Sequence, residues 1–343
     1  MDGILFVYIL SIIIFIRIDK SEYSEGFLSI SNTNSLRGIM SIAIVLHHIS
    51  EHIKDGRFFH VMNHFGYLLV AVFFFLSGYG LMIQFAKKGK EYLKTIWKNR
   101  ILYFSIILFF DTLLYIIFRC LNGESFSLQR IVLSFVSGHL LAGSSWYLVV
   151  QIYFYVFFWL SFNFSKKRKW GIFCLLLCIV LLDIIFVSLN YPSFWCFSNI
   201  AFIIGVFWAN YKSIINKILN KFYWLTLFLV FFSFVLFSMA PFFIPSKNTY
   251  FIFRIISAPI FSIFIIVVLK KIYFTGKLWA TVNIISLEIF LIHVLIYSIF
   301  RSNFINVKND FIWSSLTLIF TIIMSIPVHL FNLKIKSIIC SKK

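Results

Sequence analysis

Apolar runs of about 15 to 20 residues recur along the whole chain, and they limit the possible folds more than any other feature. A helix of about 20 residues crosses the hydrocarbon core of a bilayer, which is about 30 Å thick. Hydrophobic residues make up 61% of the chain and charged residues only 13%, so these runs cannot all be buried in soluble domains. The sequence therefore predicts an all-α integral membrane protein.

We expect a polytopic bundle of about eleven transmembrane helices. They lie near residues 3–18, 36–53, 66–86, 100–118, 146–163, 170–189, 197–210, 222–240, 250–269, 281–300 and 311–332. The first run lacks a basic start and a small-residue cleavage site, so we interpret it as a retained helix rather than a signal peptide.

Lysine and arginine cluster in every second loop between these runs. The basic segments are 87–100, 166–169, 211–221, 270–277 and the tail from residue 333. The positive-inside rule then predicts a multi-pass protein of the plasma (inner) membrane, with the N-terminus outside and the C-terminus in the cytosol. The net charge of +19 therefore indicates cytosolic loops and no nucleic-acid partner.

This alternation requires that residues 127–142 do not cross the bilayer. We expect a re-entrant or interfacial helix there.

The five cysteines, at 120, 174, 178, 196 and 340, do not indicate a metal site. Cys174 and Cys178 share one helix face, but no histidine or acidic residue lies beside them. We interpret them as core cysteines and expect no metal.

The stretch "LRGIMSIAIVLHHIS", residues 36–50, carries costly polar groups inside an apolar run. Arg37 and His48 are eleven positions apart (48 − 37), about three helical turns, so both lie on one face roughly 16 Å apart. Glu51 returns to the His48 face and can hold its imidazole in one tautomer. Two interpretations follow: interfacial anchors, or a general base with a cationic anchor for an anionic substrate.

The same stretch resembles the start of the membrane-bound acyltransferase-3 family, whose signature is an arginine, ten residues and a histidine. Four further stretches are similar to family motifs in the same order, from about residue 34 to 332. They are "VFFFLSGYGLM" (72–82), "KGKEYLKTIWKNRILYF" (88–104), "SSWYLVVQIYFY" (144–155) and "ISLEIFLIHVLIY" (285–297).

This resemblance implies a ten-helix acyltransferase domain over residues 34–343, preceded by an extra helix and linker over 1–33. It also implies transfer of an acyl group, usually acetyl from acetyl-CoA, to a hydroxyl of a surface polysaccharide or its lipid-linked precursor. Acetyl-CoA is then a co-substrate, and the lipid bilayer and a glycan are the other partners.

The resemblance and the chemistry of acyl transfer together suggest roles for eleven residues. Catalysis is assigned to His48 as general base, with Glu51, His293 and Glu288 as further catalytic candidates. Arg37, Lys98, Arg100 and Ser77 are the candidates for binding acyl-CoA, and Trp146, Tyr147 and Gln151 those for binding the acceptor. Ser77 is equally suited to close helix packing, and Trp146 and Tyr147 to an interfacial aromatic belt.

The chain departs from the family pattern at two places. Tyr103 stands where the family often has a further basic residue, and Gln151 is the one polar residue near the tryptophan of the outer motif. Asp111, Asp183 and Arg254 also lie in apolar runs, where we expect no more than buried pairing.

Two other functions are compatible with the sequence. A proton-coupled transporter or glycan flippase also needs buried ionisable residues, but matching halves with interrupted helices are not visible. A metal enzyme is suggested by His48 with His52 and by His60 with His64, four residues apart, but the remaining histidines are isolated.

Overall fold

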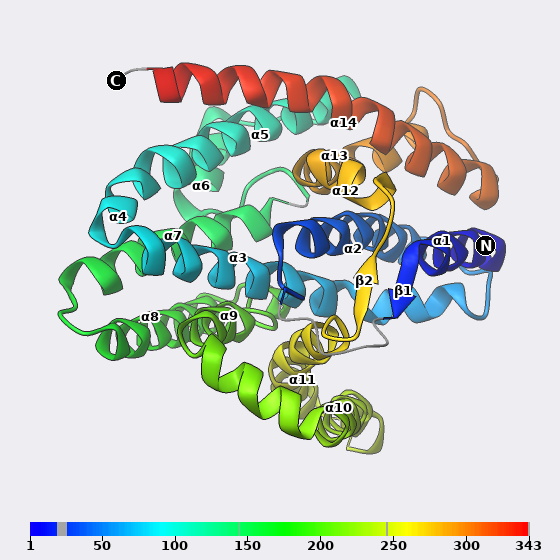
Figure 1. Ribbon diagram of the computed structural model, residues 1–343. Coiled ribbons are helices and arrows are strands. Elements are labelled where there is room, and N and C mark those ends of the chain that lie inside the picture. Colours follow the sequence, from blue (N-terminus) through cyan, green and yellow to red (C-terminus); the bar gives the residue numbers. More distant parts are fainter. Residues whose placement is uncertain (19–25, 144, 245, 342–343) are drawn as a thin grey trace.

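The computed structural model describes residues 1–18, 26–143, 145–244 and 246–341, and nearly all of these residues lie in helices (Figure 1). The helices are α1 (Asp2–Phe15), α2 (Ile30–Ser50), α3 (Gly66–Lys88), α4 (Lys90–Ile96), α5 (Tyr103–Leu121), α6 (Leu128–Ser137), α7 (Trp146–Phe164), α8 (Arg168–Ser188), α9 (Ile200–Asn210), α10 (Lys212–Phe243), α11 (Lys247–Val268), α12 (Leu278–Ile284), α13 (Ser286–Phe300) and α14 (Asp310–Ser341). Two short strands, β1 (Ile16–Ile18) and β2 (Ile272–Phe274), pair antiparallel.

The structure confirms the predicted all-helical membrane fold. Within the described residues, eight helical stretches are long and apolar enough to cross a membrane, or nine if the bent pair α12–α13 counts as one span. Two further expected spans correspond to α1 and α2. With 14 residues, α1 is short for a span, whereas α2 has 21 residues but carries many polar side chains.

One expected span is broken in two. The run 281–300 forms α12 and α13, which meet at an angle of 72° around Ile285. The short helix α12 crosses α2, where the backbone of Trp279 lies against Gly38 so closely that a Cβ at that glycine would overlap the Trp279 carbonyl oxygen. A hydropathy pattern cannot predict this contact between α12 and α2, because the contact depends on tertiary packing.

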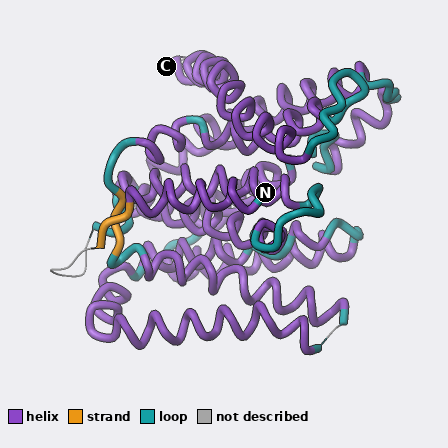
Figure 2. Tube along the Cα trace, turned by 90° about the vertical axis from the view of Figure 1, so that its right-hand side faces the viewer, coloured by secondary structure: helices purple, strands orange, loops and turns teal. Residues whose placement is uncertain are grey.

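The loops gather at two opposite ends of the bundle. At one end β1 pairs with β2, and the Lys90 ammonium donates to the carbonyl of Asn163. At the other end the Asp2 carboxylate accepts hydrogen bonds from the backbone of Phe58 and Phe59. Figure 2 shows the strand pair at one end, with the helices running across the view. The pairing of loops therefore fits helices that cross the bilayer in alternating directions.

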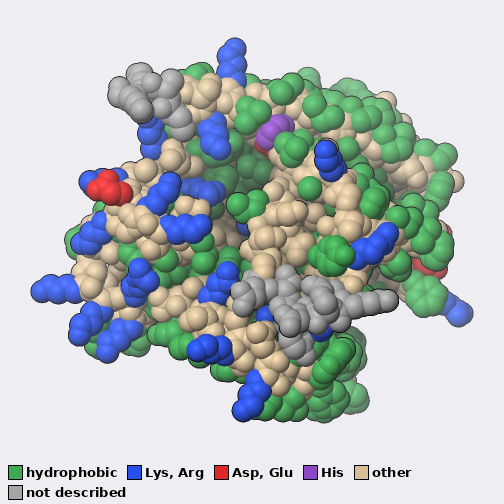
Figure 3. Space-filling model, in the orientation of Figure 1, with side chains coloured by type: hydrophobic (Ala, Val, Ile, Leu, Met, Phe, Trp, Pro, Cys, Tyr) green, Lys and Arg blue, Asp and Glu red, His purple; other side chains and the backbone are tan. Residues whose placement is uncertain are grey.

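The strand-pair end is strongly basic. Figure 3 looks onto this end and shows lysine and arginine side chains spread across a face that is hollowed near its middle. Its basic segments are 87–100, 166–169, 212–221 and 270–277. We call it the basic end, and we call the opposite end, with residues 51–65 and 301–309, the outer end.

The structure also describes the segment expected at 127–142 and the region of the expected domain boundary. Helix α6 has ten residues, about 15 Å of helix, so the segment expected at 127–142 is too short to cross the hydrocarbon core. The expected domain boundary between 33 and 34 falls within α2, and residues 19–25 of the expected linker lie outside the described residues.

The core of the bundle is formed by α2 and α3. Helix α2 is buried over most of its length and packs against α12, α13 and α3 (Figure 1). Helix α3 packs closely on α9, where Gly78 meets the backbone of Phe202 and Gly205 meets the backbone of Phe75. Small residues allow such close approach of helices in membranes. This packing fixes the face of α2 that carries Arg37 and His48.

Candidate functional site

His48 and Glu51 form a hydrogen-bonded pair at the outer end of α2. His48 Nδ1 lies 2.8 Å from a carboxylate oxygen of Glu51, which can only accept in its ionised form. The proton of the neutral imidazole is therefore held on Nδ1, and Nε2 keeps its lone pair. This arrangement suits a general base whose orientation is set by a carboxylate.

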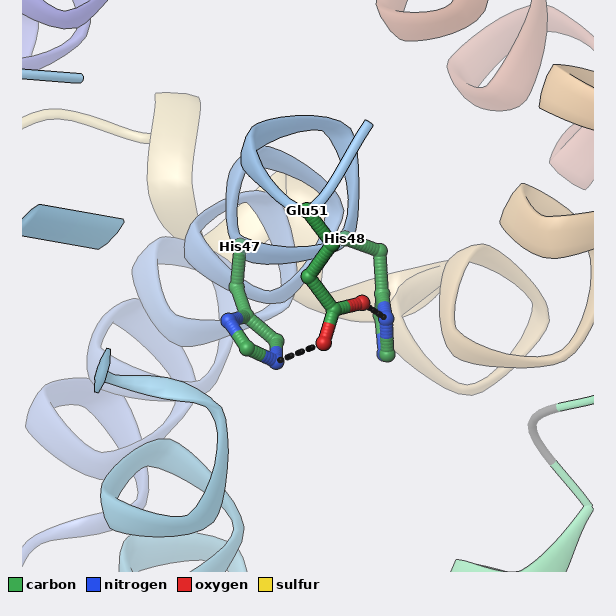
Figure 4. A group of neighbouring side chains, drawn as sticks. All are labelled: His47, His48 and Glu51. Atoms are coloured by element: carbon green, nitrogen blue, oxygen red, sulfur yellow. Dashed lines mark hydrogen bonds and ion pairs between the residues drawn. The ribbon is translucent and has the colours of Figure 1, made fainter. Parts of the chain in front are cut away.

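His47 contacts the same carboxylate from the other side (Figure 4). Its Nε2 lies 3.6 Å from Glu51, while its Nδ1 donates to the backbone carbonyl of Met62 at 2.9 Å. One ligand atom from each of these three side chains lies within 4.8 Å of the others, so the set could also hold a metal ion.

The pKa of Glu51 reflects this environment. Burial raises it, but the hydrogen bond from His48 and the nearby charges of His48, His47 and His52 lower it by more, so the net shift is downward. Glu51 therefore stays ionised at neutral pH and can stabilise a positive charge on His48.

His293 from α13 packs against His48. The two ring centroids are 4.9 Å apart, and His293 is fully buried. Its Nδ1 donates to the carbonyl of Ile289 at 3.0 Å, and its Nε2 has no hydrogen-bond partner in the described structure. The buried ring limits where the His48 imidazole can lie.

His48 lines a cavity of about 700 Å³ that opens at the outer end, and we call it the outer cavity. Its other lining residues include Glu51, His47, Trp146 and Arg254. Besides the histidines it is rich in aromatic residues, which are Tyr67, Phe194, Phe197, Tyr250, Phe290 and Tyr297.

A second cavity of about 290 Å³ lies toward the basic end, and we call it the inner cavity. Arg37 and Arg100 both line it, and no acidic residue of the described part of the chain does. Arg100 also lies over the ring of Tyr155, 5.9 Å from its centroid. Two guanidinium groups without a carboxylate favour an anionic ligand, because fixed cations in a low-dielectric site attract anions strongly.

Gln151 lines the inner cavity with its whole amide group unpaired. The side chain is 2% exposed, and neither its oxygen nor its nitrogen has a hydrogen-bond partner in the described structure. A buried unpaired amide costs about 1–3 kcal/mol, so its position at the cavity wall points to a ligand that completes these bonds.

Phe290 lines both cavities and so lies between them. Its ring lies 4.5 Å from that of Tyr147 in the inner cavity and 6.0 Å from that of His293. A continuous row of aromatic rings thus joins Tyr147 to His48 through Phe290 and His293. Helix α13 therefore lies near both ends of the α2 face: His293 packs against His48, and Phe290 lines the inner cavity with Arg37.

The structure distributes the sequence candidates unevenly. Five line the inner cavity (Arg37, Ser77, Arg100, Tyr147 and Gln151), three line the outer cavity (His48, Glu51 and Trp146), and His293 packs between them. Lys98 and Glu288 line neither. Glu288 instead accepts hydrogen bonds from His329 and Asn332 of α14.

Sequence reasoning missed three residues of the site. His47 was not among the predicted site residues, and Phe290 carries no chemical signal. For Arg254 we expected no more than buried pairing, but its guanidinium makes no hydrogen bond or ion pair in the described residues and packs on aromatic rings. Its position inside an apolar run was the only available signal.

A family profile described as an acyltransferase domain, the acyltransferase 3 profile, matches residues 30–330. No curated protein matches the chain, and no solved structure does either. The matched region contains both cavities and every sequence candidate. The chain belongs to the acyltransferase 3 family and is a multi-pass membrane acyltransferase.

Proposed function

We propose that the protein transfers an acetyl group from acetyl-CoA to a hydroxyl of a surface polysaccharide or of its lipid-linked precursor. The observation that supports this proposal is that two unlike cavities lie on either side of one side chain, Phe290, which lines both. One offers cations and an unpaired amide to a donor, and the other offers an oriented base to an acceptor.

In this proposal the donor enters from the basic end. The inner cavity is too small for a whole CoA molecule, but its volume of about 290 Å³ suits the acyl-pantetheine arm. Arg37 and Arg100 bind the phosphates, and Gln151 forms hydrogen bonds with the amide groups of the arm. The thioester then lies near Phe290, facing the outer cavity.

The acceptor binds in the outer cavity. His48 Nε2 removes the proton from the hydroxyl as its oxygen attacks the thioester carbonyl carbon. The carbon–sulfur bond breaks, and the CoA sulfur leaves with the proton that His48 returns. Glu51 keeps the imidazole oriented and stabilises the imidazolium formed in between, as carboxylates do in other acyl transferases and hydrolases.

His293 acts as a positioning residue, because its ring contacts His48 rather than either cavity. Trp146 and Tyr147 provide aromatic faces, Trp146 toward the acceptor and Tyr147 toward the donor arm. Glu288 and Lys98 have no place in this reaction, because they line neither cavity.

The orientation in the membrane follows from charge. Because lysine and arginine gather at the basic end, we place this end in the cytosol, where acetyl-CoA is made, and the outer end at the external face of the plasma (inner) membrane. The acyl group then crosses within the bundle, from the inner cavity to the outer cavity.

The O-acetyl content of surface glycan tests this proposal. A strain that lacks the gene is complemented with wild type, His48→Ala or His60→Ala at matched membrane levels, and acetyl methyl signals are measured by proton NMR. His60 is the matched control, since it lies at the same end, binds the Lys54 carbonyl and lines neither cavity.

Wild type and His60→Ala should restore acetylation, and His48→Ala should not. Equal acetylation with His48→Ala would remove His48 as the base. A deletion strain that keeps its acetylation but loses surface polysaccharide would instead identify a transporter.

A further inference from the structure

Among the residues that the structure describes, Arg254 of α11 is the one arginine that lines the outer cavity. Its guanidinium lies over the ring of Tyr250 at 4.1 Å from the centroid, over Tyr67 at 4.5 Å and near Phe197 at 5.6 Å. These cation–π contacts hold the side chain in place. Its N–H groups make no hydrogen bond or ion pair with the described residues.

No carboxylate of the described residues supplies that partner. Two other arginines near the outer end do have carboxylate partners, Arg119 with Glu124 and Arg301 with Asp310. Within the described ranges Glu51 is the one acidic residue that lines the outer cavity, and it contacts His48 and His47. Arg254 is therefore a fixed positive charge in the acceptor cavity with no carboxylate of the described residues in contact with it.

The cavity around Arg254 is suited to a sugar. Trp146, Tyr250 and Tyr297 present aromatic rings, and amphipathic rings of this kind can contact an apolar sugar face while the hydroxyl groups stay solvated. The positive charge adds a requirement that aromatic rings alone do not impose, because arginine binds planar oxyanions with paired hydrogen bonds.

We propose that Arg254 binds an oxyanion of the acceptor and so selects anionic acceptors for acylation. The oxyanion is the carboxylate of an acidic sugar or the phosphate of a lipid-linked glycan, and both present the same chemistry to the guanidinium. This proposal rests on the proposed function, because it takes the outer cavity as the acceptor site.

Binding to the purified protein in nanodiscs tests the proposal, with two pairs of probes that differ in one group. p-Nitrophenyl β-glucuronide and p-nitrophenyl β-glucoside differ by the carboxylate, and geranyl glucosyl phosphate and geranyl glucoside differ by the phosphate. Each probe is titrated against wild type, Arg254→Gln, Arg254→Lys and Arg130→Gln. Arg130 is the matched control, since it lies on α6, also near the outer end, but outside the cavity.

Wild type should prefer the anionic member of one pair by at least about tenfold, the scale of one charge-assisted hydrogen bond. Arg254→Gln should lose this preference, Arg254→Lys should keep part of it, and Arg130→Gln should keep all of it. The pair that shows the preference identifies the source of the oxyanion, a sugar acid or a lipid phosphate.

The absence of a preference in both pairs for wild type would overturn the proposal. A preference that survives in Arg254→Gln, or is lost equally in Arg130→Gln, would also overturn it. A variant that fails to fold is recognised by its thermal unfolding, and Arg254→Lys, which keeps the charge, then decides the result.

Failure of the proposed function gives a different pattern. Acetyl-CoA binding and acetyl transfer are measured in the same nanodisc samples. If acetyl-CoA binds and is used but the anion preference is absent, this inference alone fails. If acetyl-CoA neither binds nor reacts, the proposed function fails whatever the probes show.

Discussion

Substitution of Glu51 is expected to lower the rate of acyl transfer without weakening donor binding. The carboxylate lies 2.8 Å from His48 Nδ1 and outside the inner cavity. It stabilises the imidazolium that forms as the acceptor hydroxyl loses its proton, so its contribution is larger in the transition state than in the ground state. Its loss should therefore appear in kcat and leave the KM for acetyl-CoA unchanged.

The size of the effect follows from the hydrogen bond. A hydrogen bond to a charged group contributes about 1.5–3 kcal/mol, and each 1.36 kcal/mol is tenfold in rate. The Glu51 side chain is 45% exposed, so solvent screening favours the lower part of this range, about tenfold to thirtyfold for Glu51→Ala. In Glu51→Gln the amide oxygen still accepts from Nδ1, so only the charge is lost and we expect about threefold to tenfold.

The assay measures transfer of radiolabelled acetyl from acetyl-CoA to isolated surface glycan, with the protein in membrane vesicles at matched amounts. Glu91→Gln is the control, because Glu91 is a solvent-exposed carboxylate at the basic end that pairs with Lys94 and should contribute little to stability. A wild-type kcat in Glu51→Ala, or an effect confined to the KM for acetyl-CoA, would refute the reasoning.

Three further predictions concern the inner cavity, the contact between α3 and α9, and whether activity requires a divalent metal ion. Gln151→Leu removes a buried unpaired amide. In the absence of donor the variant should therefore unfold at a higher temperature than wild type, and its affinity for acetyl-CoA should be lower. An unfolding temperature below that of wild type would contradict this. Gly78→Ala should destabilise the protein by about 1–3 kcal/mol, because its Cβ would overlap the Phe202 carbonyl oxygen. Gly80→Ala on the same helix has open space and should not; equal unfolding temperatures would refute the close contact. Activity should survive removal of divalent metals by EDTA, and a loss restored by Zn²⁺ would assign His47, His48 and Glu51 to a metal instead.

Much of the fold could be predicted from the sequence because the bilayer imposes it. Helix lengths follow from the thickness of the hydrocarbon core, and the basic loops mark one end of the bundle. The bend between α12 and α13 at Ile285 could not be predicted, because it depends on the packing of α12 across Gly38 and the hydropathy of the run 281–300 does not change there.

The candidate site shows the same division. Arg37, His48 and Glu51 lie on one helix, where spacing alone determines which side chains share a face. His293, Phe290 and Arg254 come from other helices, and their positions in the site depend on tertiary packing. For Arg254 the sequence suggested no more than buried pairing, whereas the three aromatic rings around it come from α3, α11 and the segment before α9.

The central claim is that the inner cavity binds the donor and His48 performs the chemistry, and one paired measurement tests it directly. Binding and transfer of radiolabelled acetyl-CoA are measured for wild type, His48→Ala and Arg37→Gln in nanodiscs, with isolated surface glycan as acceptor. His48→Ala should bind acetyl-CoA like wild type but transfer acetyl about 10²- to 10⁴-fold more slowly, the contribution of a general base. Arg37→Gln should bind acetyl-CoA weakly and recover its rate when the donor concentration is raised. Near-normal transfer by His48→Ala, or normal donor binding by Arg37→Gln, would contradict the account.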